Sequence, residues 1–141
     1  MGHKEKIKLI IFGDEKMDWY LDEKIEKKIK DFQITNLKQI TNFNYYREYN
    51  DFYDVISSIE LTLLYEYLKE EYQIKLKFEN VSSVELTNLD YGHQDSYLSI
   101  NIERINNGWE KIKYIVEDYE EQSFRFYCEN YKVIGVEKTN N

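Results

Sequence analysis

The chain has 141 residues and a formal net charge of -8, because 27 Asp and Glu residues oppose 19 Lys and Arg residues. This balance argues against unassisted binding to nucleic acid or to an anionic membrane, since both need clustered positive charge. Hydrophobic residues make up 42% of the chain and aromatic residues 16%, which suits a folded domain rich in strands. We therefore expect one domain, residues 1–141, with its own hydrophobic core.

Cys128 is the only cysteine, so the sequence excludes an internal disulfide and a metal site built from paired thiolates. A reducing compartment fits this cysteine usage best. The apolar run from Leu9 to Phe12 is too short for a signal peptide, and no stretch approaches the length of a membrane span. We expect a cytoplasmic protein without a membrane partner.

The first elements are short. Ile7–Phe12 is an apolar run ended by Gly13-Asp14, which predicts a strand and a turn. A short helix is then predicted, with Asp18 or Asp22 capping its start. Its apolar residues are spaced by four, four and three, the spacing of one helical face: Leu21, Ile25, Ile29 and Phe32. A pair of strands remains the alternative for this stretch.

The middle of the chain contains one ambiguous segment. Residues 35–53 read as a connecting region with a strand around Phe43–Tyr49, and its candidate turn residues are Asn42, Asn44 and Asn50. Val55–Tyr67 fits a helical stripe and a strand alternation equally well. We predict a strand there, because Leu68–Glu71 would then turn directly into the next strand and form one long hairpin.

From Tyr72 onward the sequence predicts strands. Tyr72–Phe78 alternates apolar and polar residues with the two-residue period of a half-buried strand. A short strand follows at Val84–Leu86. Leu98–Glu103 and Trp109–Glu117 are then joined through Asn106-Asn107-Gly108, and Asn-Gly is favoured where a tight hairpin needs positive φ.

The end of the chain predicts a second hairpin. Phe124–Cys128 alternates up to Glu129-Asn130, and Tyr131–Val136 is expected to run back beside it, with a fraying tail at residues 137–141. Short strands at such regular spacing are typical of a sandwich or barrel. The predicted fold class is all-β or β-rich, an antiparallel sandwich or barrel with at most one or two short helices.

No catalytic signature stands in this sequence. His93 and Asp95 lie two residues apart near a predicted turn, a spacing that is weak support for a general base, and no nucleophile is placed beside them. The glycines are isolated, so a phosphate loop is excluded, and no recognised spacing joins His93, Cys128 and carboxylates into a metal site. We expect no catalytic residues, no metal and no cofactor; the protein is not predicted to be an enzyme.

Two acidic groups are the better candidates for a binding site. One caps the predicted hairpin at residues 117–121, and the other spans residues 14–23, where Met17, Trp19 and Tyr20 are interleaved with five acids. Acids interleaved with aromatics suit a cationic protein surface, because charges steer the encounter and aromatics supply buried area. A solvated face beside core aromatics is the alternative for each group. The predicted partner-binding residues are Glu117, Asp118, Tyr119, Glu120, Glu121, Asp14, Glu15, Asp18 and Tyr20.

With these residues laid out, three segments resemble small bacterial immunity proteins: Leu76–Leu86, Trp109–Tyr114 and Phe126–Asn130. The family is encoded beside wall-associated or contact-dependent toxins of low-GC Gram-positive bacteria. The nearest likeness is to the immunity protein of wall-associated RHS-repeat toxins, whose C-terminal tips are tRNA nucleases. The first seventy residues resemble no family.

The resemblance implies a cytoplasmic antitoxin that binds the C-terminal domain of one cognate toxin and occludes its active site, without direct nucleic-acid binding. Nucleases carry basic clefts, for which an acidic surface is complementary. A β-sandwich that binds a small ligand or carbohydrate through Trp19, Trp109 and the tyrosines is the alternative, and it requires a concave pocket lined by aromatics. An enzyme using His93 and Asp95 comes third.

Overall fold

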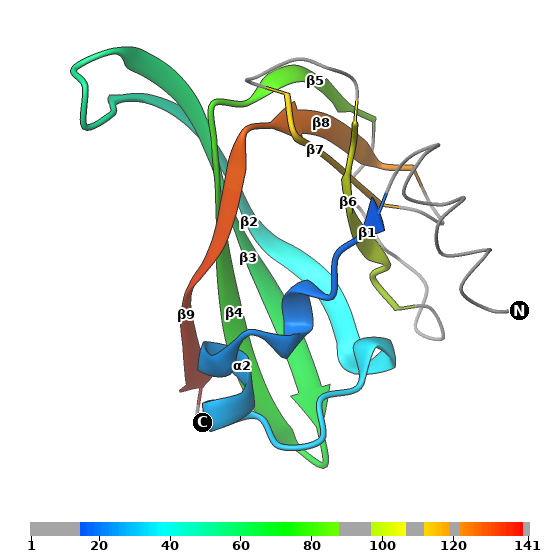
Figure 1. Ribbon diagram of the computed structural model, residues 1–141. Helices are drawn as coiled ribbons and strands as arrows, with labels where there is room; N and C mark the ends of the chain where they lie inside the picture. Colours follow the sequence, from blue (N-terminus) through cyan, green and yellow to red (C-terminus); the bar gives the residue numbers. More distant parts are fainter. Residues whose placement is uncertain (1–14, 88–96, 107–111, 119–121, 140–141) are drawn as a thin grey trace, which may run out of the picture.

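Two antiparallel sheets pack face to face in the computed structural model, which describes residues 15–87, 97–106, 112–118 and 122–139 (Figure 1). The five-stranded sheet has the order β1 (Glu15–Lys16), β6 (Ile100–Arg104), β7 (Tyr114–Asp118), β8 (Phe124–Cys128) and β5 (Ser82–Leu86). The four-stranded sheet has the order β2 (Leu37–Tyr49), β3 (Val55–Tyr67), β4 (Glu70–Glu79) and β9 (Asn130–Thr139). The predicted β-rich class is confirmed, and its form is a sandwich rather than a closed barrel.

The ambiguous segment Val55–Tyr67 is a strand, as predicted, and it pairs antiparallel with β4 through the turn at Leu68-Lys69. Periodicity alone did not distinguish a strand from a helix here, but the burial of the segment's side chains does. Alternate residues of β3 are fully buried on the inner face of the sheet, with the two-residue period of an extended chain. These residues are Ile59, Leu61, Leu63 and Tyr65.

The antiparallel pairing of the first predicted hairpin is confirmed, since β6 and β7 pair from Ile100 opposite Asp118 to Arg104 opposite Tyr114. A two-residue turn at Asn107-Gly108 would instead place Arg104 opposite Lys111, so the predicted tight turn is wrong. The loop residues 107–111 lie outside the described residues. The strand that starts at Trp109 in the prediction is shorter in the structure, where it begins at Tyr114.

The second predicted hairpin is wrong. β8 belongs to the five-stranded sheet, whereas β9 pairs with β4 in the other one, with Leu76 opposite Val133. At the crossing, the backbone N–H of Glu129 donates to the carbonyl oxygen of Glu79 at 3.0 Å, which directs the chain to β4. Pairing with β4 continues to Thr139, so the predicted fraying from Glu137 is wrong as well.

The predicted helix is present but short. It comprises α2 (Glu23–Lys28), preceded by the 3-10 turn η1 (Trp19–Leu21), and a second turn η2 (Ile34–Asn36) leads into β2. The Asp22 side chain caps α2 by accepting from the backbone N–H of Lys24 at 2.8 Å. Among the described residues, no helix is long and apolar enough to cross a membrane. The predicted strand Ile7–Phe12 lies outside the described residues.

Aromatic rings hold the two sheets together. Phe78 of β4 meets Phe126 of β8 edge to face, with ring centroids 5.0 Å apart, and Tyr114 meets Tyr131 in the same way at 5.1 Å. Phe43 of β2 contacts Phe126 from the side at 6.4 Å. Each such pair contributes about 1 kcal/mol beyond its buried area, so these contacts fix how the sheets sit on one another.

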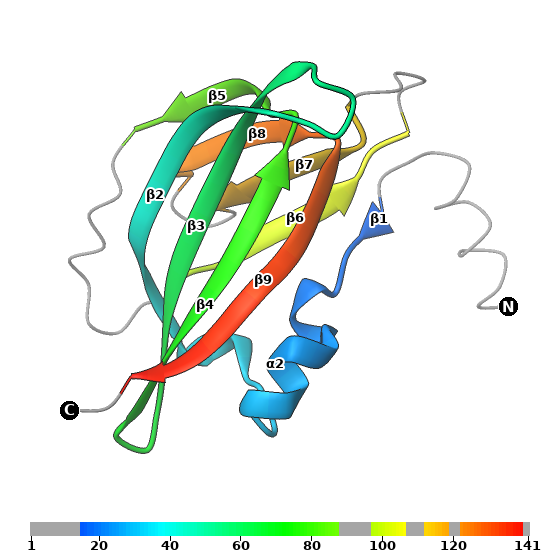
Figure 2. The same ribbon diagram turned by 90° about the vertical axis from the view of Figure 1, so that its left-hand side faces the viewer.

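The inner face of the four-stranded sheet is longer than its cover. Its lower part packs against the segment of α2 and η1, where Phe32 stacks on Tyr65 at 4.8 Å, and its middle packs against the five-stranded sheet. On β3 the inner-facing residues are fully buried in the middle, but Val55 and Tyr67 at the two ends are half exposed. The β2–β3 hairpin therefore projects beyond the sandwich (Figure 1), and Figure 2 shows the four-stranded sheet in front, with β2, β3, β4 and β9 side by side. We call residues 45–57 the hairpin arm.

The β3–β4 turn allows a test of backbone strain. Leu68 and Lys69 both have positive φ, 49° and 67°, in a two-residue hairpin turn that favours Asn-Gly. Leu68 is exposed, so its replacement loses little packing. The double change Leu68→Asn and Lys69→Gly should raise the free energy of unfolding by about 1 kcal/mol in urea titrations. Leu68→Ala, which keeps the strain, is the control; equal stability of all three proteins would contradict the assignment of strain.

Candidate functional site

The hairpin arm carries the aromatic side chains with the largest exposed fractions in the described parts of the chain. Phe52 and Tyr53 at its tip are 82% and 86% exposed, and Tyr49 beside them is 70% exposed. Tyr45 and Val55 are about half exposed on the same arm. Scattered exposed apolar residues are ordinary, but a group of five on one projecting element is a candidate interaction surface.

Three of these residues continue the inner face of the four-stranded sheet. Tyr45 lies opposite the buried Ile59, and Tyr49 lies opposite Val55, with no irregularity between the two pairs. The side chains of Tyr45, Tyr49 and Val55 therefore point to the face that, further along β2 and β3, forms the core. They are exposed because the sandwich ends before the arm does.

The turn at the tip is held by side-chain and backbone hydrogen bonds. Asn50 Oδ1 accepts from the backbone N–H groups of both Phe52 and Asp54 at 2.9 Å. The Asn50 N–H donates to the Asp54 carbonyl oxygen at 2.9 Å, and the Tyr53 N–H donates to the Asn50 carbonyl oxygen at 3.0 Å. Tyr53 has a positive φ of 62°. The exposed rings are thus mounted on a bonded turn, which reduces the entropy lost when they are buried by a partner.

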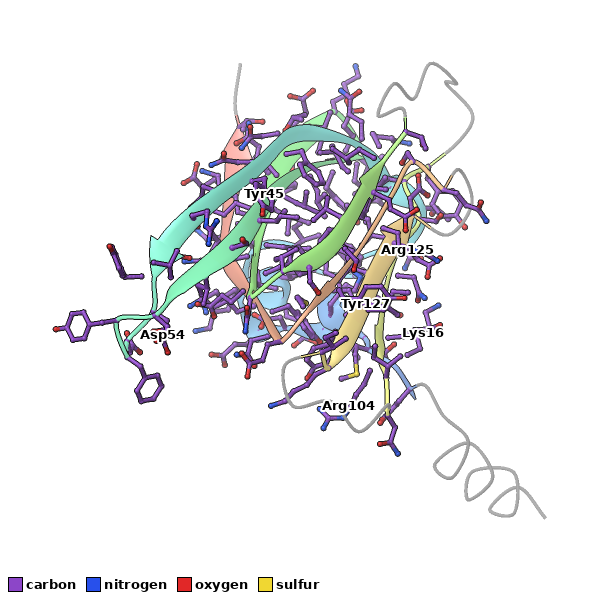
Figure 3. The ribbon with its side chains drawn as sticks, turned by 90° about the horizontal axis from the view of Figure 1, so that it is seen from above. Lys16, Tyr45, Asp54, Arg104, Arg125 and Tyr127 are labelled. Carbon is purple, nitrogen blue, oxygen red and sulfur yellow. The ribbon has the colours of Figure 1, made fainter. Side chains whose placement is uncertain are left out.

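Acidic side chains flank the rings. Asp51 and Asp54 are exposed at the tip, and Asp54 lies at the far end of the arm, away from Lys16, Arg125 and Tyr127 on the five-stranded sheet (Figure 3). The tip therefore combines aromatic rings with negative charge on one projection. This is the combination that the sequence predicted for residues 117–121 and 14–23, found at a different place.

A polar network holds the base of the arm on the outer face of the sheet. Glu48 accepts from the Ser58 hydroxyl at 2.5 Å and pairs with Lys77 at 2.9 Å, while the Tyr46 hydroxyl donates to Glu60 at 2.7 Å. The Lys77 ammonium also lies over the Tyr46 ring, 5.8 Å from its centroid. These contacts join β2, β3 and β4 where the arm leaves the sandwich.

The network changes how its members ionise. The hydrogen bond from Ser58 and then the interaction with Lys77 lower the pKa of Glu48. Burial opposes the charged form of Lys77, but its interactions with Glu48 and Tyr46 outweigh burial, so the pKa of Lys77 is raised. The two pKa shifts have opposite directions, as an acid paired with a base requires, and both favour the charged pair at neutral pH.

The acidic group predicted to cap the hairpin, residues 117–121, is not exposed as a unit among the described residues. Asp118 is fully buried, which contradicts its predicted role at an exposed tip. Its carboxylate accepts from the Ser123 hydroxyl at 2.7 Å and from the Ser99 hydroxyl at 3.2 Å, so it fixes the end of β7 instead. Glu117 is half-buried on the outer face of the five-stranded sheet. Tyr119, Glu120 and Glu121 lie outside the described residues.

A shallow hollow of about 270 Å³ lies beside Glu117. Arg125 sits between two acids there, since it is opposite both Glu117 and Glu85 in the sheet, and its guanidinium pairs with Glu85 at 2.6 Å. This pair offsets part of the negative charge that the sequence placed in the region. The lining residues are Glu85, Glu117, Asp118, Gln122, Phe124 and Arg125.

The N-terminal acidic group is partly exposed. Glu15 on β1 and Asp18 are exposed, whereas Tyr20 is half-buried and stacks on Phe32 at 5.5 Å, with its hydroxyl 3.4 Å from Asp18. Burial and then the Asp18 charge raise the pKa of Tyr20. Glu15 lies opposite Arg104 of β6, whereas Glu117 lies opposite Asn101, so the structure does not bring the two acidic groups together. Asp14 lies outside the described residues.

The ligand-binding alternative loses one of its named residues. Trp19 is buried, and its indole N–H donates to the Ile100 carbonyl oxygen at 3.3 Å, so this ring belongs to the core. A hollow of about 350 Å³ next to it is lined mainly by polar residues and contains one aromatic ring, that of Tyr97. Trp109, His93 and Asp95 lie outside the described residues.

The described residues offer little for catalysis. Burial raises the pKa of Cys128 to about 12, so its thiol is not an activated nucleophile. In the part of the chain that the structure describes, no group of three His, Cys, Asp or Glu side chains could hold a metal ion.

The sequence interpretation missed the hairpin arm. It placed a strand at Phe43–Tyr49 and a turn at Asn50, and both are confirmed. The candidate turns at Asn42 and Asn44 are wrong, because both residues lie inside β2, which already begins at Leu37. Phe52 and Tyr53 were given no role. A usable signal was present, because two adjacent aromatics inside an Asn-Asp turn segment cannot both be core residues of a strand. What the sequence did not show is that the flanking tyrosines would also be uncovered.

The network at the base of the arm generates a pH prediction. The lowered pKa of Glu48 means that its charged form stabilises the protein above the ordinary value of 4.5, and that this contribution is lost as pH falls through the lowered value. Glu48→Gln should therefore cost roughly 1 kcal/mol near neutral pH and less in acid. Urea unfolding across this range measures the difference, with Glu66→Gln in β3, on the same outer face of the four-stranded sheet, as control. A pH-independent difference would contradict the role of ionisation.

Comparison of the chain with protein-family models, with curated proteins and with solved structures found no match.

Proposed function

We propose that this chain is an immunity protein: a non-catalytic antitoxin that binds the C-terminal domain of a cognate toxin and occludes it, with the hairpin arm as the main contact. The observation that carries this proposal is the exposed aromatic group on a bonded, projecting hairpin. Such a group loses solvent exposure only when another molecule covers it. The resemblance of three segments to immunity proteins supports the class of partner.

The arm has the composition and shape of a binding hot spot. Tyrosine, together with tryptophan and arginine, dominates the energetics of protein interfaces, and the arm presents three tyrosines beside Phe52 and the exposed Arg47. Its turn is already bonded through Asn50, so binding need not order it first. A projecting element of this kind fits a concave partner surface, such as the cleft of a nuclease.

Charge supports a basic partner. The chain carries a net charge of -8, and Asp51 and Asp54 extend that sign to the tip of the arm. An acidic surface attracts a basic cleft during diffusional encounter and raises the association rate, an effect that salt weakens. Glu15, Asp18 and Glu117 would contribute to the same long-range attraction without contacting the partner directly.

Removing the two rings at the tip tests the arm. The double change Phe52→Ala and Tyr53→Ala should raise the Kd for the toxin domain encoded immediately upstream by roughly 30-fold or more, because two exposed hot-spot residues are lost. Surface plasmon resonance or calorimetry measures this. Tyr67→Ala with Leu68→Ala is the matched control, since it removes two exposed apolar side chains from the opposite end of β3. Equal loss in both variants would contradict a specific role for the arm.

Co-expression tests the function as a whole. Cells that produce the toxin domain encoded immediately upstream should survive when this chain is produced with it, and should die when it is absent. The arm variant should protect less well than the Tyr67 and Leu68 control at the same level of soluble protein. Death of the cells despite soluble wild-type protein would overturn the immunity proposal.

A further inference from the structure

The two sheets have four edges, and three of them are protected against pairing with another strand. β1 has two residues, and β5 has five residues with a break in its pairing and a positive φ of 51° at Ser83. β9 packs against α2, carries Lys132 and Lys138, and has an irregularity beside Gly135. Short strands, lysines and bulges are the usual ways in which proteins prevent unwanted edge pairing.

The fourth edge lacks these protections over residues 42–49 of β2. These residues pair in unbroken register with residues 55–62 of β3, and they include neither lysine nor proline. Irregularities in β2 occur only before residue 42. Within the described parts of the chain, the backbone of residues 42–49 forms hydrogen bonds with β3 alone. A long, regular, unpaired edge is a template for an added strand.

The turn identifies which backbone groups face outward. The N–H of Asn50 donates to the carbonyl oxygen of Asp54, and in an antiparallel pair the hydrogen-bonded positions recur at every second residue. The Ser57 carbonyl oxygen accepts from Val81, on the side of β3 away from β2, which agrees with this phase. The outward-facing N–H and C=O groups therefore belong to Phe43, Tyr45, Arg47 and Tyr49.

We propose that this edge of β2 is where the partner docks, by adding an extended strand with alternating apolar and basic residues to the four-stranded sheet. This inference rests on the proposed function and specifies its geometry. The residues that offer free backbone groups also include Tyr45 and Tyr49, so an added strand would pack its apolar residues against exposed rings. Main-chain bonds supply affinity in this mode, and alternate side chains supply specificity.

Charge selects the partner strand over a second copy of this chain. Two copies would each bring a net charge of -8, and that repulsion opposes association. A basic strand would instead meet the negative charges of Asp51 and Asp54 next to the edge. The charge of Glu48 is already paired with Lys77.

Amide exchange resolved by NMR tests the inference in the wild-type protein, with the toxin domain encoded upstream as the first probe. In the free chain, the amides of Asn44, Tyr46 and Glu48 should exchange slowly, and those of Phe43, Tyr45, Arg47 and Tyr49 quickly. Strand addition should slow the second set and leave the first set slow. Protection at the arm tip without protection of this alternating set would overturn strand addition while leaving the proposed function intact.

Arg47→Pro removes one outward N–H and blocks the approach of a strand, and proline is tolerated at such edge positions. Arg47→Ala is the matched control, because it removes the same side chain but keeps the N–H. Arg47→Pro should weaken toxin binding by about tenfold relative to Arg47→Ala. Equal binding by the two variants, with equal thermal stability, would overturn the inference.

A synthetic peptide of alternating valine and lysine separates the two proposals. At millimolar concentration it should shift the amide signals of residues 42–49 in the wild type and not in Arg47→Pro. If the toxin domain does not bind, the proposed function fails. The peptide then tests strand addition at the β2 edge by itself, and the absence of shifts at residues 42–49 would overturn that inference. Sedimentation of the free chain as a dimer that Arg47→Pro dissociates would assign the edge to a second copy and overturn the choice of a partner strand.

Discussion

The difference in length between the two sheets is the constraint on which the rest of the structure depends. β2 and β3 have 13 residues each, roughly 40 Å, whereas β6, β7 and β8 have five residues each, roughly 17 Å. The short sheet covers only the middle of the long one. The segment of α2 and η1 covers one end with buried rings, and nothing among the described residues covers the other. The hairpin arm is what remains of the long sheet beyond its cover.

An uncovered sheet end is ordinarily a source of disorder or aggregation, and this one is built to stay ordered. Asn50 bonds the turn at the tip, while Glu48, Lys77 and Ser58 fix the base where the arm leaves the sandwich. The backbone of the arm is thus bonded at both points, and the rings that it carries are exposed. Order at both ends makes the arm suitable for recognition, since a partner that covers it recovers the hydrophobic free energy without first ordering the chain.

Acidic residues show how far charge can be interpreted without a structure. Glu117 and Asp118 are adjacent in the sequence, yet Glu117 lies on the outer face of its sheet and Asp118 is buried against two serine hydroxyls. Alternation along a strand separates neighbours onto opposite faces, so a run of acids is divided between surface and interior. Arg125 then pairs with Glu85 near the remaining charge. The net negative charge is a property of the whole chain, and the fold determines which acidic side chains are exposed to a partner.

The sequence by itself determined the β-rich class, the antiparallel pairing of β6 with β7, the capped helix and most core faces, because these depend on local periodicity and turn chemistry. It correctly placed Tyr72–Phe78 and Phe124–Cys128 as half-buried strands. Only the tertiary structure decided that Val55–Tyr67 is extended, that β9 leaves β8 to pair with β4, and that the arm stays uncovered. Those outcomes depend on which faces and edges meet across the sandwich, and strand pairing over long separations leaves no local pattern in the chain.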